Sequence, residues 1–205
     1  MEYLDIEKRS FQIITQELQE RGICLPEEEE LVLKRVIHTS ADFDYVKTLC
    51  FSNDAVKTLK KLIKNGADIV TDTNMALAGI NKKVLAQFGG QTHCFMADED
   101  VALQAQHRGM TRAAVSMEKA AEIDKPVIFA IGNAPTALIK LYEMSTEKDW
   151  TPNFIIGVPV GFVNVETAKE LILGTEIPYI INKGQKGGSN IAAAICNAVL
   201  YQMQE

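Results

Sequence analysis

The chain has 205 residues, with 27 Asp and Glu against 21 Lys and Arg, and its net charge of −6 argues against non-specific nucleic-acid binding. Hydrophobic residues make up 47% and charged residues 23%, an ordinary globular composition with enough apolar material for a full core. The first ten residues are too polar for a secretory signal, and no apolar run reaches the roughly 20 residues that span a bilayer. We therefore expect one soluble, cytoplasmic domain, residues 1–205, with no nucleic-acid or membrane partner.

The first 66 residues are expected to form three helices. Apolar residues recur at helical spacing from residue 5 to 21, and Gly22 can end this helix. A second helix is expected to open at Pro26, where four glutamates follow, and to end near His38. Ser52 or Asn53 can cap a third helix, which the Asn-Gly pair at 65–66 ends.

From residue 67 onward, short apolar runs alternate with helical patterns. This alternation predicts an α/β fold, an open and mainly parallel sheet of about five strands with helices on both faces and right-handed connections. The expected strands are 67–71, 92–96, 126–131, 154–158 and 178–181. The expected helices are 81–87, 98–108, 112–123, 135–144, 165–173 and 191–201.

Four segments that follow predicted strands are rich in Gly, Asn or Thr. They are 72–75, 132–136, 157–162 and 184–189. Ligands of such folds bind outside the carboxyl ends of the strands, and helix N-termini there offer N–H groups to an anion. Four such loops at one edge indicate a large polar ligand, with Asn133 and Thr136 as candidate contacts. Ordinary turn chemistry is the alternative for each loop, and the last loop, GQKGGS, matches neither phosphate-loop nor dinucleotide motifs.

His38 is the first candidate for proton chemistry among the three histidines of the chain. It lies where a helix should end, and the negative helix end, with Asp42 or Asp44 nearby, would favour the imidazolium form of a general acid. Spacing alone leaves the alternative of a packed or surface histidine open.

The cysteines and the other histidines show no metal-binding pattern. The four cysteines lack a CxxC pair, which is typical of free thiols in a reducing compartment, and they are Cys24, Cys50, Cys94 and Cys196. His93 with Cys94 and His107 fits no closed zinc site, so we expect no metal and a surface position for His107 on its helix.

Several longer motifs, taken together, resemble the precorrin-8X methylmutase family of corrinoid biosynthesis. The resemblance covers nearly the whole chain in collinear order, and AIGNAPTAL and GVPVGFV are its most specific parts. The motifs are KRSF at 8–11, RVIHTSADFD at 35–44, DTNMALAGI at 72–80, TRAA at 111–114, AIGNAPTAL at 130–138, IIGVPVGFVNVETAKELI at 155–172 and KGQKGGSNIAAAICNA at 183–198.

The resemblance implies a cofactor-free isomerase with a Rossmann-like fold that acts as a homodimer. Its substrate would be precorrin-8X or cobalt-precorrin-8, in which a methyl group moves from carbon 11 to carbon 12 of the macrocycle to give hydrogenobyrinic or cobyrinic acid. His38 corresponds to the catalytic histidine of the family. The residues that would line the substrate site are Ser10, Arg35, Asp72, Asn74, Met75 and Arg112.

The last glycine loop departs from the family, because relatives often carry arginines where this chain has Asn182, Gln185 and Lys186. Lysine keeps the charge but loses the bidentate fork of arginine, and Lys186 is the residue of this loop expected to contact a substrate carboxylate. The alternative function is a carrier that binds a tetrapyrrole without transforming it. A change in the absorption spectrum of the precursor would distinguish the enzyme from the carrier.

Overall fold

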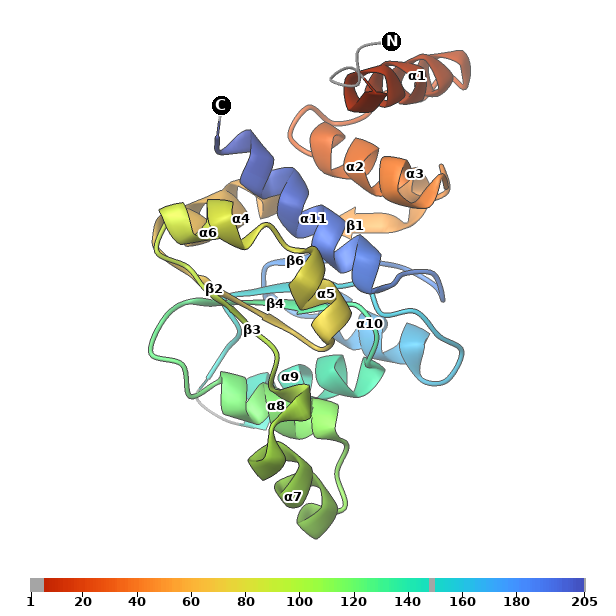
Figure 1. The fold of residues 1–205 in the computed structure, drawn as a ribbon. Coiled ribbons are helices and arrows are strands. Elements are labelled where there is room, and N and C mark those ends of the chain that lie inside the picture. Colours follow the sequence, from red (N-terminus) through yellow and green to blue (C-terminus); the bar gives the residue numbers. More distant parts are fainter. Residues whose placement is uncertain (1–5, 148–149, 205) are drawn as a thin grey trace.

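A central sheet of six strands organises the part of the chain that this computed structural model describes, residues 6–147 and 150–204 (Figure 1). The strand order is β1-β6-β5-β4-β2-β3, and all neighbours are parallel except β1, which runs antiparallel to β6. The strands are β1 Leu49–Phe51, β2 Asp68–Thr71, β3 Thr92–His93, β4 Val127–Ile131, β5 Phe154–Gly157 and β6 Tyr179–Asn182.

Helices cover both faces of the sheet, as the sequence predicted. One layer contains α2 Glu30–Ser40, α4 Ala55–Lys64, α5 Asn74–Gly79, α6 Lys82–Gln87 and α11 Ser189–Gln202, with α1 Ile6–Glu20 and α3 Tyr45–Thr48 packed at its outer side. The other layer contains α7 Glu99–Arg108, α8 Arg112–Ala120, α9 Pro135–Glu147 and α10 Val165–Leu173. Within the described ranges, no helix combines the length and apolar composition that crossing a membrane needs.

Strand β4 shows why the central strands are apolar along their whole length. Its residues are fully buried and alternate between two cores, with Ile128 and Ala130 facing the layer of α2 and α11. Val127, Phe129 and Ile131 face the layer of α8 and α9. A parallel sheet that is covered on both faces needs apolar side chains in both directions, so its strands read as continuous hydrophobic runs.

The five strands predicted from the sequence did not include β1, a three-residue edge strand that is too short to show a periodic pattern. Its pairing with β6 continues beyond Phe51, because the Ser52 hydroxyl accepts the N–H of Tyr179 at 2.9 Å. Ser52 therefore does not cap the third helix, which begins at Ala55 after Asp54 in a left-handed conformation. The predicted caps, Ser52 and Asn53, were wrong for this reason.

Other elements also differ from those predicted. The second helix begins at Glu30 rather than Pro26, whose carbonyl accepts the N–H groups of Glu29 and Glu30 in a preceding turn. Strand β3 ends at His93 and is followed by a short 3-10 helix, and α5 was not predicted. Residue 5, the predicted start of the first helix, lies outside the described residues.

A buried carboxylate joins the two strands at which the strand order reverses. Strands β3 and β4 lie on opposite sides of β2, so the crevice of this fold type is expected between the carboxyl ends of β2 and β4. Asp72, which follows β2, is 1% exposed and accepts N–H bonds from Gly132 (2.9 Å), Asn133 (2.8 Å) and Ala134 (2.6 Å). Burial raises the pKa of the Asp72 carboxyl, and the three N–H bonds oppose that rise.

A buried ammonium group lies at the same edge of the sheet, farther along the strand order. Lys169 of α10 is 1% exposed, and its Nζ donates to the carbonyl oxygens of Gly184 (2.6 Å) and Lys186 (3.0 Å). Both acceptors belong to residues 183–188, the connection between β6 and α11, which we call the 183–188 loop. Burial lowers the pKa of Lys169 from 10.5 to about 8.

Replacing Asp72 by asparagine should lower the free energy of unfolding by about 1–3 kcal/mol, because the amide keeps one acceptor oxygen for three N–H donors. Urea denaturation at neutral pH measures this change. The exposed Asp124 supplies the control, since Asp124→Asn removes a charge without a buried partner. Equal denaturation midpoints for the two variants would show that Asp72 is not a structural clamp.

The stability of the wild type relative to Lys169→Met should rise between pH 8 and pH 10.5, the interval between the folded and ordinary pKa of Lys169. In this interval the unfolded chain binds more protons at Lys169 than the folded chain, so unfolding becomes less favourable as pH increases. Denaturant titrations of both proteins across this range measure the difference. Lys140→Met is the control, because the Glu143 carboxylate raises the pKa of Lys140 and predicts no gain in this interval. A difference that does not depend on pH contradicts the assignment.

Candidate active site

The short strand β1 brings the end of α2 to the edge of the sheet where the other strands end. Because β1 is antiparallel to β6, Leu49 pairs with Asn182, the last residue of β6, and the residues before Leu49 extend beyond that end. The segment 41–48, which connects α2 to β1, therefore lies beside the 183–188 loop. Two hydrogen bonds confirm this, from the Thr48 hydroxyl to Asn182 Oδ1 (2.7 Å) and from the Lys183 N–H to the Thr48 carbonyl (2.8 Å).

His38 lies in the last turn of α2, as the sequence predicted. The helix ends when Ala41 takes a left-handed conformation with φ 54° and donates its N–H to the Ile37 carbonyl at 2.7 Å. The His38 side chain is exposed, and its ring centroid lies 5.4 Å from that of Phe11. Within the described ranges, neither ring nitrogen has a hydrogen-bond partner. Both nitrogens are therefore available to a ligand.

Arg35 lies one turn before His38 and is held by α1 and α11. It forms an ion pair with Glu7, and its guanidinium lies over the rings of Phe11 (4.8 Å) and Tyr201 (5.1 Å). These cation–π contacts restrict the guanidinium without using its N–H groups. The hydroxyl of Ser10 donates to the Ile6 carbonyl at 2.9 Å, which leaves an oxygen lone pair for a ligand. The structure thus brings Arg35 and His38 to the ring of Phe11, and Ser10 directly precedes Phe11 on α1.

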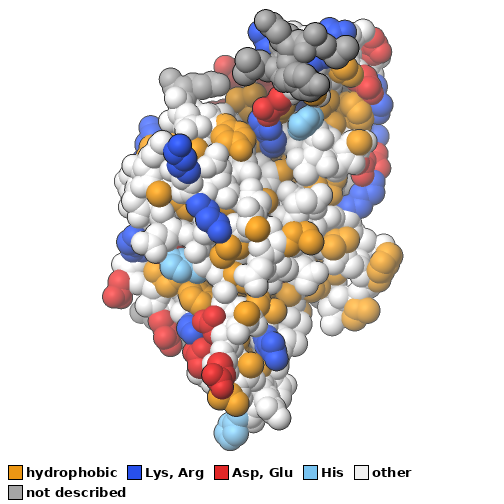
Figure 2. Space-filling view, viewed as in Figure 1, with side chains coloured by type: hydrophobic (Ala, Val, Ile, Leu, Met, Phe, Trp, Pro, Cys, Tyr) orange, Lys and Arg blue, Asp and Glu red, His pale blue; other side chains and the backbone are white. Residues whose placement is uncertain are grey.

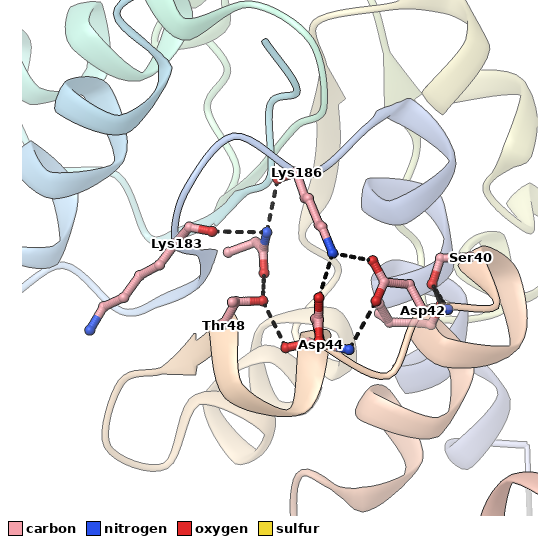
Figure 3. A network of polar contacts seen from close by, with 8 residues as sticks. Ser40, Asp42, Asp44, Thr48, Lys183 and Lys186 are labelled. Carbon is pink, nitrogen blue, oxygen red and sulfur yellow. Dashed lines mark hydrogen bonds and ion pairs between the residues drawn. The ribbon is translucent and has the colours of Figure 1, made fainter. Parts of the chain in front are cut away.

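Lys186 connects the 183–188 loop to the segment that follows α2 (Figure 3). Its Nζ donates to Asp42 Oδ2 at 2.7 Å and to Asp44 Oδ2 at 2.8 Å. These hydrogen bonds raise the pKa of Lys186 and lower that of Asp42. One cation with two carboxylates leaves this cluster with a net charge of −1, so it is a poor anion site by charge alone. The contact between Lys186 and a substrate carboxylate stays a prediction.

The remaining predicted residues lie at the ends of β2 and β4. Asn74 and Met75 are exposed in the first turn of α5, which Thr73 caps by accepting the Ala76 N–H at 3.1 Å. Asn133 is exposed, and Thr136 accepts the Thr111 hydroxyl at 3.0 Å.

Arg112 follows Thr111 and is exposed at the start of α8. Among the described residues, no hydrogen bond or ion pair joins Arg112 to the group around His38.

Asp72 accepts the N–H groups that were expected from the sequence to bind an anion. The predicted anion site at the start of α9 is therefore already filled by a carboxylate of the chain itself, at least for the N–H groups of Gly132, Asn133 and Ala134. The location of Asp72 at the site edge was predicted, but its bonding partners were not. Its contact with a substrate stays a prediction.

The loop between β5 and α10 was predicted from the sequence as a candidate ligand loop, residues 157–162, but the exposure of its apolar side chains was not. Phe162 is 87% exposed, Val163 76% and Val160 47%. Hydrophobic side chains project at the corresponding edge of the surface in Figure 2. The loop is joined to the 183–188 loop by the Gly161 N–H, which donates to the Gln185 carbonyl at 3.1 Å. The hydrophobic run GVPVGFV, which continues past the end of the strand, was the available signal.

Lys169 was also missed, although its spacing carried a signal. In the predicted helix 165–173, Val165, Ala168 and Ile172 form the buried face, and Lys169 belongs to that same face. A lysine on the apolar face of an amphipathic helix indicates a buried partner.

The cleft between α1 and α2 does not coincide with the predicted residues. It has a volume of about 340 Å³, and it is lined by Thr15, Leu18, Gln19, Gly22, Ile23, Cys24, Leu25, Glu30 and Lys34. Ser10, Arg35 and His38 are not among the residues that line this cleft.

Comparisons with known proteins show the family to which the chain belongs. The family model described as precorrin-8X methylmutase matches residues 5–202. A cobalt-precorrin-8 methylmutase of Salmonella typhimurium is 46% identical over 86% of this chain and 82% of its own length. A cobalt-precorrin-8 methylmutase of Priestia megaterium is 39% identical over 95% of this chain and 85% of its own length.

A solved structure shares the fold as well. The crystal structure of a precorrin-8X methylmutase from Thermus thermophilus superposes with a TM-score of 0.87, at 33% identity, over 98% of both chains. The family model and both curated relatives cover most of the chain. The chain therefore belongs to the precorrin-8X methylmutase family and is an isomerase of corrin biosynthesis.

Proposed function

We propose that this protein moves a methyl group from carbon 11 to carbon 12 of cobalt-precorrin-8, giving cobyrinic acid, with His38 as the proton donor. The observation that carries the proposal is the exposed imidazole of His38, which has no partner among the described residues and lies one turn from Arg35. The names of the two curated relatives support the cobalt-containing substrate over metal-free precorrin-8X. Cobalt would arrive as part of the substrate.

The reaction is an isomerisation, so it needs no net proton, oxidant or reductant. The bond from the methyl carbon to carbon 11 breaks, and a bond to carbon 12 forms. His38 donates a proton to the macrocycle as the methyl group moves, and a ring position returns a proton afterwards. The protein contributes by holding the flexible ring in a reactive geometry and by placing the imidazole against it.

The anionic groups of the substrate explain the arrangement of basic residues. Arg35 is proposed to bind a substrate carboxylate in place of Glu7, and Arg112 to bind another at the end of β4. Carboxylate recognition by arginine uses paired N–H donors, which the stacking of Arg35 between Phe11 and Tyr201 leaves free.

All the other residues predicted for the substrate site except Asp72 are proposed to contact the macrocycle or its side groups. Asp72 is proposed to act by holding residues 132–134 in place. The contact residues are Ser10, Asn74, Met75, Asn133, Thr136 and Lys186.

Assembly as a homodimer of this single domain in the cytoplasm is part of the same proposal. Two exposed isoleucines of α1, Ile6 (60%) and Ile13 (46%), support a contact with a second copy. Light scattering on the purified protein measures the assembled mass, and a mass of 22.7 kDa would refute the dimer.

Replacing His38 by alanine should reduce turnover of cobalt-precorrin-8 by about 10²–10⁴-fold, the usual contribution of a general acid. Binding of cobyrinic acid should remain, because the imidazole acts on the macrocycle only during the methyl shift. Absorption spectroscopy follows the rearranged chromophore, and a carrier protein would leave the spectrum of the precursor unchanged. His107→Ala, an exposed histidine of α7, is the matched control. Turnover of His38→Ala near that of the control would refute the assignment.

Replacing Glu7 by glutamine should lower KM, since it removes the carboxylate that competes with the substrate for Arg35. The expected decrease is up to about fivefold, the scale of a partly exposed ion pair. Steady-state kinetics measure KM and kcat separately. Glu17→Gln is the control, because Glu17 pairs with Arg21 on the same helix, away from Arg35. An increase in KM would show that Glu7 supports binding instead of competing with it.

A further inference from the structure

The carbonyl groups of the 183–188 loop are held from inside the protein by two buried donors. Lys169 donates to the carbonyl oxygens of Gly184 at 2.6 Å and of Lys186 at 3.0 Å. Asn182, which is fully buried, donates its Nδ2 to the same Lys186 carbonyl at 2.8 Å. Both lone pairs of the Lys186 carbonyl are therefore used, and its peptide plane is fixed from two sides.

Because peptides are planar, the directions of these carbonyls also fix the directions of the N–H groups that follow them in the loop. In a trans peptide, the carbonyl of one residue and the N–H of the next point in opposite directions. Because the carbonyls of Gly184 and Lys186 face Lys169, the N–H groups of Gln185 and Gly187 face away from it. Among the described residues, neither N–H has an acceptor.

Gly187 fits this geometry because the chain passes close to the end of β5. A Cβ atom at this position would lie 2.0 Å from the carbonyl oxygen of Val158. The same carbonyl accepts the Gly188 N–H at 2.8 Å, which ties the loop to the sheet. The two N–H groups that face away from Lys169 thus belong to a loop that is held by Lys169 and Asn182 and tied to the end of β5 at Gly188.

Charge distinguishes these N–H groups from the side chain of Lys186 as donors to an anion. Lys186 is already bound by Asp42 and Asp44, which leave that cluster with an excess of negative charge. Oriented backbone N–H groups bind anions without a charged side chain and without loss of side-chain freedom.

We infer that Lys169 is a positioning residue that directs the N–H groups of Gln185 and Gly187 toward a carboxylate of the substrate. The inference rests on the proposed function, which supplies a substrate with several carboxylates. Lys169 touches neither the substrate nor the migrating methyl group. It acts through the loop.

A purely structural role would predict a different outcome of substitution. Burying an ammonium group is costly, and a methionine of similar length removes that cost. If Lys169 served stability alone, Lys169→Met would change the free energy of unfolding and leave the Kd for cobyrinic acid unchanged. If it positions the loop, the free peptides can rotate in the variant and lose their fixed orientation.

The test compares Lys169→Met with the wild type in two measurements on the full-length protein. Equilibrium titration with cobyrinic acid should show an increase in Kd of about tenfold, the scale of one charge-assisted hydrogen bond. Steady-state kinetics with cobalt-precorrin-8 should show a similar increase in KM and a much smaller change in kcat, since a carboxylate contact that is the same in the ground state and the transition state affects KM alone. Lys140→Met is the matched control, because Lys140 is also partly buried but pairs with Glu143 on α9.

The same substitution in a Lys186→Met background shows whether the loop N–H groups or the Lys186 side chain donate to the carboxylate. Lys169→Met should raise Kd to the same degree in the wild type and in Lys186→Met. If Lys186→Met alone raises Kd and Lys169→Met adds nothing to it, the side chain is the donor and the inference is overturned. Unchanged Kd in Lys169→Met also overturns it. A wild type that neither binds cobyrinic acid nor converts the precursor would instead refute the proposed function.

Discussion

Asp72 accepts hydrogen bonds from the N–H groups of residues 132–134. The arrangement of the sheet edge at the carboxyl ends of the parallel strands depends on these bonds. They close the crevice between β2 and β4, where proteins of this architecture commonly bind an anion. An internal carboxylate satisfies the three N–H groups, so the ends of two neighbouring strands are locked together. In the function proposed above, the substrate therefore lies over this edge, in contact with loops and helix ends instead of inside the crevice.

The edge strand β1 supplies the second half of the surface. By pairing antiparallel with β6, it turns the chain so that the segment 41–48, which follows α2, lies beside the 183–188 loop. The ion pairs of Lys186 with Asp42 and Asp44 add side-chain contacts between this segment and the loop. A histidine from one layer of helices is thereby placed at the same edge as the loops that follow the parallel strands.

Two of the basic residues proposed for this surface are already paired with carboxylates of the chain. Arg35 is bound by Glu7, and Lys186 by two aspartates. Such pairs keep the cations oriented before a substrate arrives, and an incoming carboxylate exchanges one anion for another. Exposed pairs of this kind contribute little to stability, roughly 0–1 kcal/mol, so their exchange is energetically possible. This accounts for an anionic substrate on an acidic protein.

The sequence by itself determined the alternation of strands and helices, the position of His38 in the last turn of a helix, and the resemblance to the methylmutase family. These features depend on local periodicity and on motifs, which a single chain displays directly. The tertiary structure alone decided that β1 pairs with β6, that Asp72 fills the crevice and that Lys169 holds the 183–188 loop. Each of these is a contact between residues separated in sequence, from 15 positions for Lys169 and Gly184 to 133 for Leu49 and Asn182. Spacing along the chain does not encode the partners of such contacts, because they are set by how the layers pack on the sheet.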